Sequence, residues 1–214
     1  MKNIINRLSD QIEKDVISIY RHLHQYPELS FQEKETSFFI EEILKKEGIP
    51  HSSRIGGYGI LARIEGKKEG THIIGLRADM DALPIEEKNQ IEYRSKIPHV
   101  MHACGHDIHM AALLGAARLL AARREQLAGN VLFLFQPAEE AATGAMQVLE
   151  QGLFRRVPMA GMLALHVWPG LAQGQLGIRS GAILSAVDSF EITVTGRGGH
   201  GSAPERACNP IPAG

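Results

Sequence analysis

Hydrophobic residues near the start of the chain recur every three or four positions. The first such stripe consists of Ile4, Leu8, Ile12, Val16, Ile19 and Leu23. This spacing is typical of an amphipathic helix, which should end before Pro27. Ser30 and Glu33 have the spacing of a capping box for a second helix that stops at Gly48. That helix carries the apolar residues Phe38, Phe39, Ile43 and Leu44.

Four later segments have the hydrophobic pattern of strands, and helical patterns separate them. The expected strands cover residues 58–66, 71–81, 130–137 and 162–167, with a polar turn at 67–70. The nearly continuous apolar run of the second segment suits a central strand covered on both faces. Helices are expected over residues 107–123 and 145–154. Strands alternating with helices indicate an α/β fold with a layered sheet, whose functional sites gather beyond the carboxyl ends of the strands.

The pattern changes after Gly181. Residues 185–214 combine an alternating stretch, expected to be a strand, with a glycine-rich loop. We interpret residues 1–184 as part of one domain and residues 185–214 as the beginning of a second.

The amino-acid composition indicates which broad class of protein this is. The 214 residues are 44% hydrophobic and 22% charged, which is typical of a soluble globular chain. Its 23 basic and 24 acidic residues leave no positive field for nucleic acid or an anionic membrane, so neither is an expected partner. The first residues carry frequent charges and no apolar run, which argues against a signal peptide and favours a cytoplasmic location.

The densest group of chemically active residues is His102-Ala-Cys104-Gly-His106-Asp107. Cys104 and His106 are two residues apart just before a predicted helix, so both side chains can face one cation. A helix N-terminus also favours the thiolate that a metal requires. The alternative is a buried cysteine among ordinary loop histidines.

Glu139 and Glu140 follow a predicted strand directly. Adjacent carboxylates diverge, so one can bind a metal while the other faces the substrate water, as metal-assisted hydrolysis requires. An acidic pair is otherwise usually a solvated surface.

Asp79, Asp81 and His166 also stand at predicted strand ends. A carboxylate there can accept a hydrogen bond from the far nitrogen of a metal-bound histidine, a role favoured for Asp81 over Asp79. Asp81 could instead cap the turn before Pro84, and His166 could be a buried core residue.

Residues 196–201 satisfy the pattern G-x-G-x-x-G, but the proline-containing segment after them is no helix that could receive a pyrophosphate. Nucleotide binding is therefore rejected. His200 on this loop could donate a hydrogen bond to an oxyanion, or the loop could be a plain hairpin connection.

Together, LRADMDALPIEE, MHACGHDIHMAALLGAARLL, FLFQPAEE, ALHVWPG and GGHGSAPE resemble the signature blocks of the hippurate and auxin-conjugate hydrolases. These form the amidohydrolase branch of the family that includes aminoacylase and succinyl-diaminopimelate desuccinylase. The resemblance covers nearly the whole chain and implies a layered mixed sheet flanked by helices, as in zinc peptidases. It further implies the beginning of a smaller α+β lid domain.

The resemblance also implies a site and its cofactors. Two divalent ions, of zinc, manganese, cobalt or nickel, would be held by Cys104, His106, Glu140 and His166, with Cys104 bridging. Glu139 would be the general base and acid, with Asp81 supporting the ligands and His200 reaching a partner's active site in a homodimer formed through the lid. The substrate would be an N-acyl amino acid or a similar small conjugate.

Two departures from the family pattern stand out. The family usually has histidine after the proline of GGHGSAP, where this chain has Glu205. Full-length relatives also continue and supply a further metal-binding histidine, whereas this sequence stops at Gly214. The chain as given is therefore expected to bind metal weakly and to hydrolyse poorly. The alternatives are a hydrolase with Cys104 as nucleophile and a non-enzymatic remnant that acts as a binding module.

Overall fold

The computed structural model describes residues 2–186, 188 and 190–214, and the side chains of residues 2–5 and 156 lie outside the description. Helices and strands alternate along the first part of the chain. The helices are α1 (Lys2–Gln25), α2 (Lys34–Lys46), α3 (His106–Ala121), α4 (Gly144–Glu150) and α5 (Leu153–Arg156). The strands are β1 (His51–Ile55), β2 (Gly59–Glu65), β3 (Lys68–Asp79), β4 (Ala128–Gln136) and β5 (Gly161–Ala164).

The five strands form one mixed sheet in the order β1-β2-β4-β3-β5. The pairs β1–β2 and β2–β4 are antiparallel, whereas β4–β3 and β3–β5 are parallel. The carboxyl ends of β3, β4 and β5 therefore meet at one edge of the sheet, where the expected site residues follow each strand. The predicted α/β class with a mixed sheet flanked by helices is confirmed.

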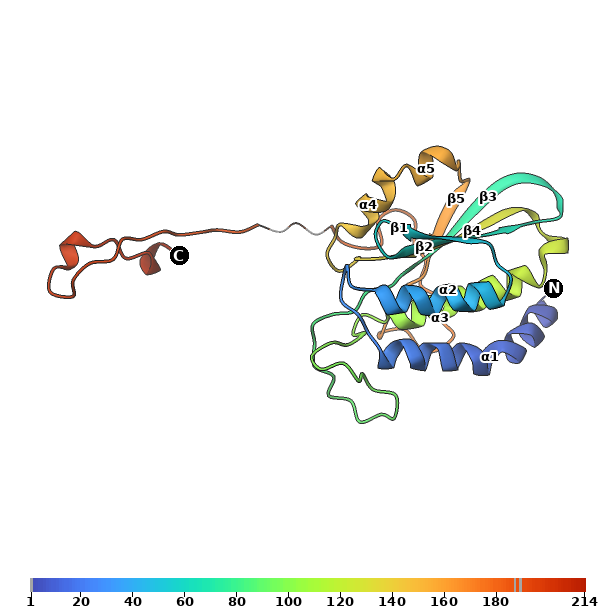
Figure 1. Ribbon diagram of the computed structural model, residues 1–214, viewed down its shortest axis with the longest axis horizontal. Helices are drawn as coiled ribbons and strands as arrows, with labels where there is room; N and C mark the ends of the chain where they lie inside the picture. The colour runs from blue at the N-terminus through green and yellow to red at the C-terminus, as the bar shows by residue number, and fades with distance from the viewer. Residues whose placement is uncertain (1, 187, 189) are drawn as a thin grey trace. The chain divides into compact units, whose positions relative to one another are not determined.

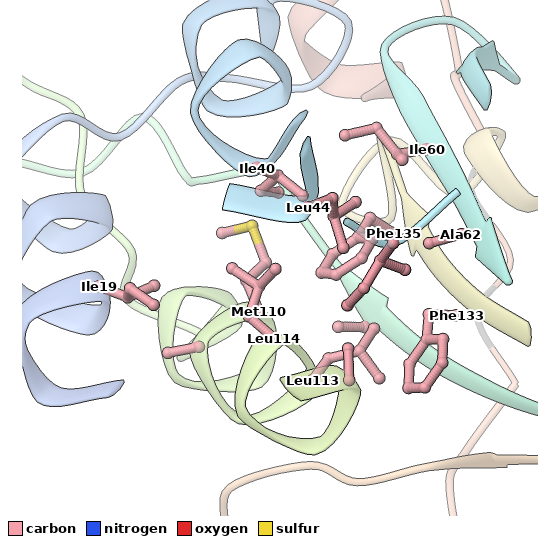
Figure 2. Packing of buried hydrophobic residues seen from close by; sticks show 14 of the residues in the cluster. Ile19, Ile40, Leu44, Ile60, Ala62, Met110, Leu113, Leu114, Phe133 and Phe135 are labelled. Atoms are coloured by element: carbon pink, nitrogen blue, oxygen red, sulfur yellow. The ribbon is translucent and has the colours of Figure 1, made fainter. Parts of the chain in front are cut away.

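Helices cover both faces of the sheet, as Figure 1 shows. One face carries α2 and α3, with α1 packed against α3, and the other face carries α4 and α5. The main core lies between the sheet and the three long helices, where Phe133 and Phe135 of β4 meet Met110 and Leu114 of α3 and Leu44 of α2 (Figure 2). Each such side chain contributes about 1.5–3 kcal/mol when it leaves water. This core holds α3, whose first residue is His106, against the sheet.

The first predicted helix is confirmed, and it ends at Gln25, before Pro27. Ile19 and Leu23 of its apolar stripe are buried, while the side chain of Ile4 lies outside the described residues. None of the described helices combines the length and the apolar character that crossing a bilayer requires.

The predicted capping box of α2 is wrong. The Ser30 hydroxyl donates to Asp81 Oδ2 at 2.6 Å, and Glu33 Oε1 accepts from the backbone N–H of Ala138 at 2.7 Å. Both side chains are thus used in tertiary hydrogen bonds, and neither caps the helix. The Glu28 carboxylate instead accepts from the N–H groups of Glu35 and Thr36, where a negative charge also suits the helix dipole.

Several element boundaries differ from the predicted ones. The polar, largely exposed strand β1 was not predicted, and β3 begins at Lys68 inside the expected turn. The helix expected over 145–154 is divided at Gly152, whose φ of 76° interrupts helical geometry. The last predicted strand shortens to β5 because it pairs with β3 over four residues only.

The chain divides into two compact units, residues 1–168 and residues 169–214. Residues 169–184 lie in the second compact unit, and the predicted domains of residues 1–184 and 185–214 stay a prediction. Residues 190–196 form no strand, although their alternation predicted one, and Val187 and Ser189 lie outside the described residues. A strand needs a hydrogen-bonded neighbour, and the described part of this unit offers only the bridge between Arg197 and Cys208.

Candidate metal centre

Polar side chains from four elements meet at the carboxyl edge of the parallel strands. Asp79 is the last residue of β3, Glu139 and Glu140 follow β4, and His166 follows β5. His106 begins α3, which packs against β3. Loops at this edge of an open α/β sheet are where ligands usually bind.

Within the described residues, three overlapping groups of side chains could hold a cation, with candidate ligand atoms within 4.8 Å of one another in each group. The groups are Cys104–His106–His166, His106–Glu139–Glu140 and Asp79–His106–His109. All of them contain His106. The structure therefore brings together all four predicted ligands and the predicted base, which come from three separate parts of the chain.

His106 is held by one ring nitrogen and leaves the other free. Its Nδ1 donates to the backbone carbonyl of Asp81 at 2.8 Å. Its Nε2 and the Glu140 Oε1 atom, 3.8 Å apart, are buried and have no hydrogen-bond partner among the described residues. Buried polar atoms without partners are costly. A cation between them would satisfy both, so this donor set fits a metal ion.

The thiol of Cys104 faces His166. Its Sγ lies 3.4 Å from His166 Nε2, while His166 Nδ1 donates to the carbonyl of Val167 at 2.7 Å. Burial and the negative charges of Glu140 and Glu139 raise the pKa of Cys104 to about 12. In the protein without a cation, burial and these charges therefore favour the neutral thiol. A divalent cation at the sulfur would offset the charge of the carboxylates.

Asp81 lies beside His106 and beside the turn that carries both glutamates, and its support of the ligand histidine stays a prediction. Its carboxylate, which is 1% exposed, accepts from the N–H groups of Glu139 at 3.0 Å and Glu140 at 2.9 Å, and from the Ser30 hydroxyl. Its nearest oxygen is 3.5 Å from His106 Nδ1, which bonds to the backbone carbonyl instead. The carboxylate therefore fixes the turn that carries both glutamates, and the backbone of the same residue orients the histidine.

The two adjacent glutamates have different environments. The side chain of Glu139 is 42% exposed, and that of Glu140 is 22% exposed. Partial burial and the charge of Asp79 raise the pKa of Glu139, which makes it a better proton acceptor and donor near neutral pH. The division of roles, with Glu139 as base and Glu140 as ligand, stays a prediction.

Asp79 and His109 form a pair whose second member was not predicted. Burial opposes the charged form of Asp79, but hydrogen bonds from His109 Nδ1 at 2.6 Å and Arg77 at 2.7 Å hold its pKa well below the usual range. His109 stands three residues after His106, on the same face of α3. That helical spacing was the signal that could have identified it.

A second buried histidine network lies beside the site. His24 Nδ1 contacts Asp107 Oδ2 at 2.6 Å, and its Nε2 contacts Glu87 Oε1 at 3.2 Å. The network links the end of α1, the loop before α3 and the first turn of α3. Burial opposes the charged form of His24, but the hydrogen bonds to Asp107 and Glu87 outweigh it and raise the pKa of His24.

This raised pKa predicts how the stability depends on pH. The stabilisation is present in full below the pKa of an unfolded histidine, about 6.5, and is lost as pH rises through the higher pKa of the folded state. The free energy of unfolding that His24→Gln removes should therefore be larger at about pH 6 than at about pH 9. Urea unfolding with a chelator present measures the difference, and equal losses at both pH values would contradict the prediction.

His200 belongs to the unit of residues 169–214. Its Nδ1 accepts from the Ser202 hydroxyl at 2.8 Å and from the Ser202 N–H at 3.3 Å, which leaves the proton on Nε2. Such a nitrogen can donate a hydrogen bond, as an oxyanion would require, and this role stays a prediction. Two three-residue 3-10 turns, Pro204–Arg206 and Ile211–Ala213, follow the glycine-rich loop. Glu205 lies in the first of these turns and is exposed.

Comparison with known proteins identifies the family. Residues 75–209 match the family described as Peptidase family M20/M25/M40, and the chain belongs to this family. It is 47% identical over 200 residues to an N-acetyl-L-cysteine deacetylase of Bacillus subtilis, covering 94% of this chain and 47% of the relative. It is 42% identical over 214 residues to an N-acyl-L-amino acid amidohydrolase of Geobacillus stearothermophilus, covering 100% of this chain and 57% of the relative.

Solved structures agree with the fold. A Bacillus subtilis protein described as a dinuclear metal-binding peptidase of the M20 family is 42% identical, with a TM-score of 0.76 over 80% of this chain and 48% of that protein. A putative aminohydrolase from Staphylococcus aureus has a TM-score of 0.79 at 35% identity over 99% of this chain and 56% of that protein. The chain spans about half the length of the relatives it matches.

Proposed function

We propose that this chain is part of a metal-dependent amidohydrolase that cleaves the amide bond of N-acyl amino acids or similar small conjugates. One observation carries the proposal: Cys104, His106, Glu140 and His166 converge around buried atoms that have no hydrogen-bond partner in the described part of the chain, with Glu139 beside them. The names of relatives, a deacetylase of N-acetyl-L-cysteine and an amidohydrolase of N-acyl-L-amino acids, support the substrate class.

The residues divide into ligands and a proton carrier. Cys104, His106, Glu140 and His166 would hold two divalent ions of zinc, manganese, cobalt or nickel, since thiolate, imidazole and carboxylate suit all four metals. When bound, such ions lower the pKa of a water molecule from about 15.7 toward ~7 and polarise the substrate carbonyl. Glu139 would take the proton from the attacking water and deliver it to the leaving nitrogen.

Further parts of the proposal concern the whole protein. His200 would donate to the oxyanion of the tetrahedral intermediate, from a second copy of the chain in a dimer formed through the lid that begins at 185–214. A cytoplasmic location is proposed because a thiolate ligand such as Cys104 stays reduced there.

A Co²⁺ titration of the 214-residue chain tests the ligand set. The wild-type chain should develop the near-ultraviolet absorption of a Co²⁺–thiolate bond, and Cys104→Ala should lose this band and bind at least ~10-fold more weakly, the scale on which coordination changes act. Cys208→Ala is the matched control because Cys208 lies in the other unit. Equal spectra for wild type and Cys104→Ala would refute the assignment.

A second candidate function is a hydrolase with a cysteine nucleophile, which the 3.4 Å approach of Cys104 Sγ to His166 Nε2 favours. The raised pKa of Cys104 opposes it, because a thiol beside two carboxylates resists ionisation. Cys104→Asp separates the two functions. A carboxylate still binds metal and keeps some activity in a metalloenzyme, whereas a cysteine nucleophile would be lost outright and its activity would resist chelators.

The remaining alternative is a binding module without enzymatic activity. It would be favoured if the chain bound no divalent ion tightly and cleaved none of the acetyl, benzoyl and indole-acetyl amino acids. Metal titration and a metal-loaded substrate screen on the same preparation decide between this alternative and the amidohydrolase.

A further inference from the structure

Val167 connects the two segments that present Cys104 and His166. Its carbonyl accepts from His166 Nδ1 at 2.7 Å, and its N–H donates to His109 Nε2 at 3.0 Å. Its side chain packs on Gly105, where a Cβ atom would come within 2.4 Å of Val167 Cγ2. All three of these contacts restrain one residue that follows the short strand β5.

His109 is itself fixed at both ring nitrogens. Its Nε2 accepts the Val167 N–H, so the ring proton must be on Nδ1, which donates to Asp79 Oδ1 at 2.6 Å. The other oxygen of Asp79 accepts from Arg77 at 2.7 Å. The charged, buried carboxylate therefore selects the tautomer of His109, and that tautomer provides the acceptor that Val167 needs.

We propose that Asp79 and His109 are positioning residues that hold Val167 and thereby set the tautomer and the orientation of His166. With Val167 in place, its carbonyl accepts a hydrogen bond from the Nδ1–H of His166, and His166 Nε2 faces Cys104 with its lone pair. The inference rests on the proposed function in one respect, because that function makes His166 a ligand. In this proposal Asp79 and His109, which are not among the predicted ligands, ensure that His166 presents Nε2 to the metal.

The alternative role for His109 is that of a metal ligand, since it belongs to one of the three groups that could hold a cation. The hydrogen bonds argue against it. Both ring nitrogens of His109 already have partners, whereas Nε2 of His106 has none among the described residues. A cation on His109 would have to displace either the Asp79 carboxylate or the Val167 amide.

The experiment follows the His166 tautomer in the metal-free 214-residue chain by long-range ¹H–¹⁵N spectra. The wild type should show His166 protonated on Nδ1, and His109→Leu should shift the population toward protonation on Nε2. His109→Gln should retain the wild-type tautomer, because its amide can donate to Asp79 and accept from Val167. His109→Leu should also weaken Co²⁺ binding by about 10–100-fold, the usual effect of removing a residue that orients a ligand.

Leu114→Ala is the matched control, because it removes a buried side chain from the same helix without touching the site. It should lower stability and leave the His166 tautomer unchanged. If His109→Leu does not fold, Asp79→Asn, which removes the charge that His109 Nδ1 requires, should shift the tautomer in the same direction.

The outcomes separate this inference from the proposed function. A wild-type tautomer in the folded His109→Leu chain, or a shift of equal size in Leu114→Ala or His109→Gln, would overturn the positioning role. A tautomer shift confined to His109→Leu, in a chain whose wild type binds no Co²⁺, would support the positioning role and refute the metal site.

Discussion

Replacing Glu139 with glutamine should lower the rate of amide hydrolysis by about 10²–10⁴-fold, the usual contribution of a general acid–base group. Glutamine keeps the size of the side chain but can neither take a proton from water nor deliver one to the leaving nitrogen. Metal binding should be nearly unchanged, because Glu140 is the proposed ligand of the pair. The initial rate with an N-acetyl amino acid and the stoichiometry of bound Co²⁺ are measured on the same metal-loaded preparation.

Glu150→Gln is the control for Glu139→Gln, since Glu150 is an exposed acid at the end of α4. It should leave both measurements unchanged. If Glu139→Gln loses both metal and activity, Glu139 is a metal ligand and Glu140 becomes the candidate base. If Glu139→Gln keeps full activity, Glu139 is not the general base.

The largest effect on stability is expected at Asp81. Asp81→Ala removes a buried acceptor from two backbone N–H groups and the Ser30 hydroxyl, and should lower the free energy of unfolding by about 3 kcal/mol or more. Ser30→Ala removes only one of the three hydrogen bonds and should cost about 1 kcal/mol. Urea unfolding in the presence of a chelator measures both. If Asp81→Ala lowers the free energy of unfolding no more than Ser30→Ala does, the turn that carries Glu139 and Glu140 does not depend on the Asp81 carboxylate.

Some of the residues behind these expectations were predicted from the sequence, and others were not. Glu139, Glu140 and His166 were identified because each lies at or just after the end of a predicted strand, and strands of a parallel sheet end at a common edge. The structure confirms that these side chains meet there. His109 was missed because, within the sequence, it is one more residue on an Ala- and Leu-rich helix, and its partners lie 30 and 58 positions away.

Hydrogen-bond partners were the least predictable feature. Ser30 and Glu33 have the spacing of a capping box, yet their side chains bond to Asp81 and to the Ala138 amide. The local pattern is compatible with both uses. The buried polar groups of the turn after β4 need hydrogen-bond partners. The first amides of α2 already have one, because the Glu28 carboxylate accepts from them.

The sequence by itself determined the α/β class, the C-terminal end of the first helix and the residue types gathered at the site, because periodicity and strand ends are local properties of the chain. Only the tertiary structure decided which atoms meet. It assigned the Asp81 carboxylate to the glutamate turn, aimed His166 at Cys104 and joined Asp79 to Val167 through His109. Contacts between residues far apart in the chain depend on how the helices and the sheet pack, and side-chain spacing carries no record of that packing.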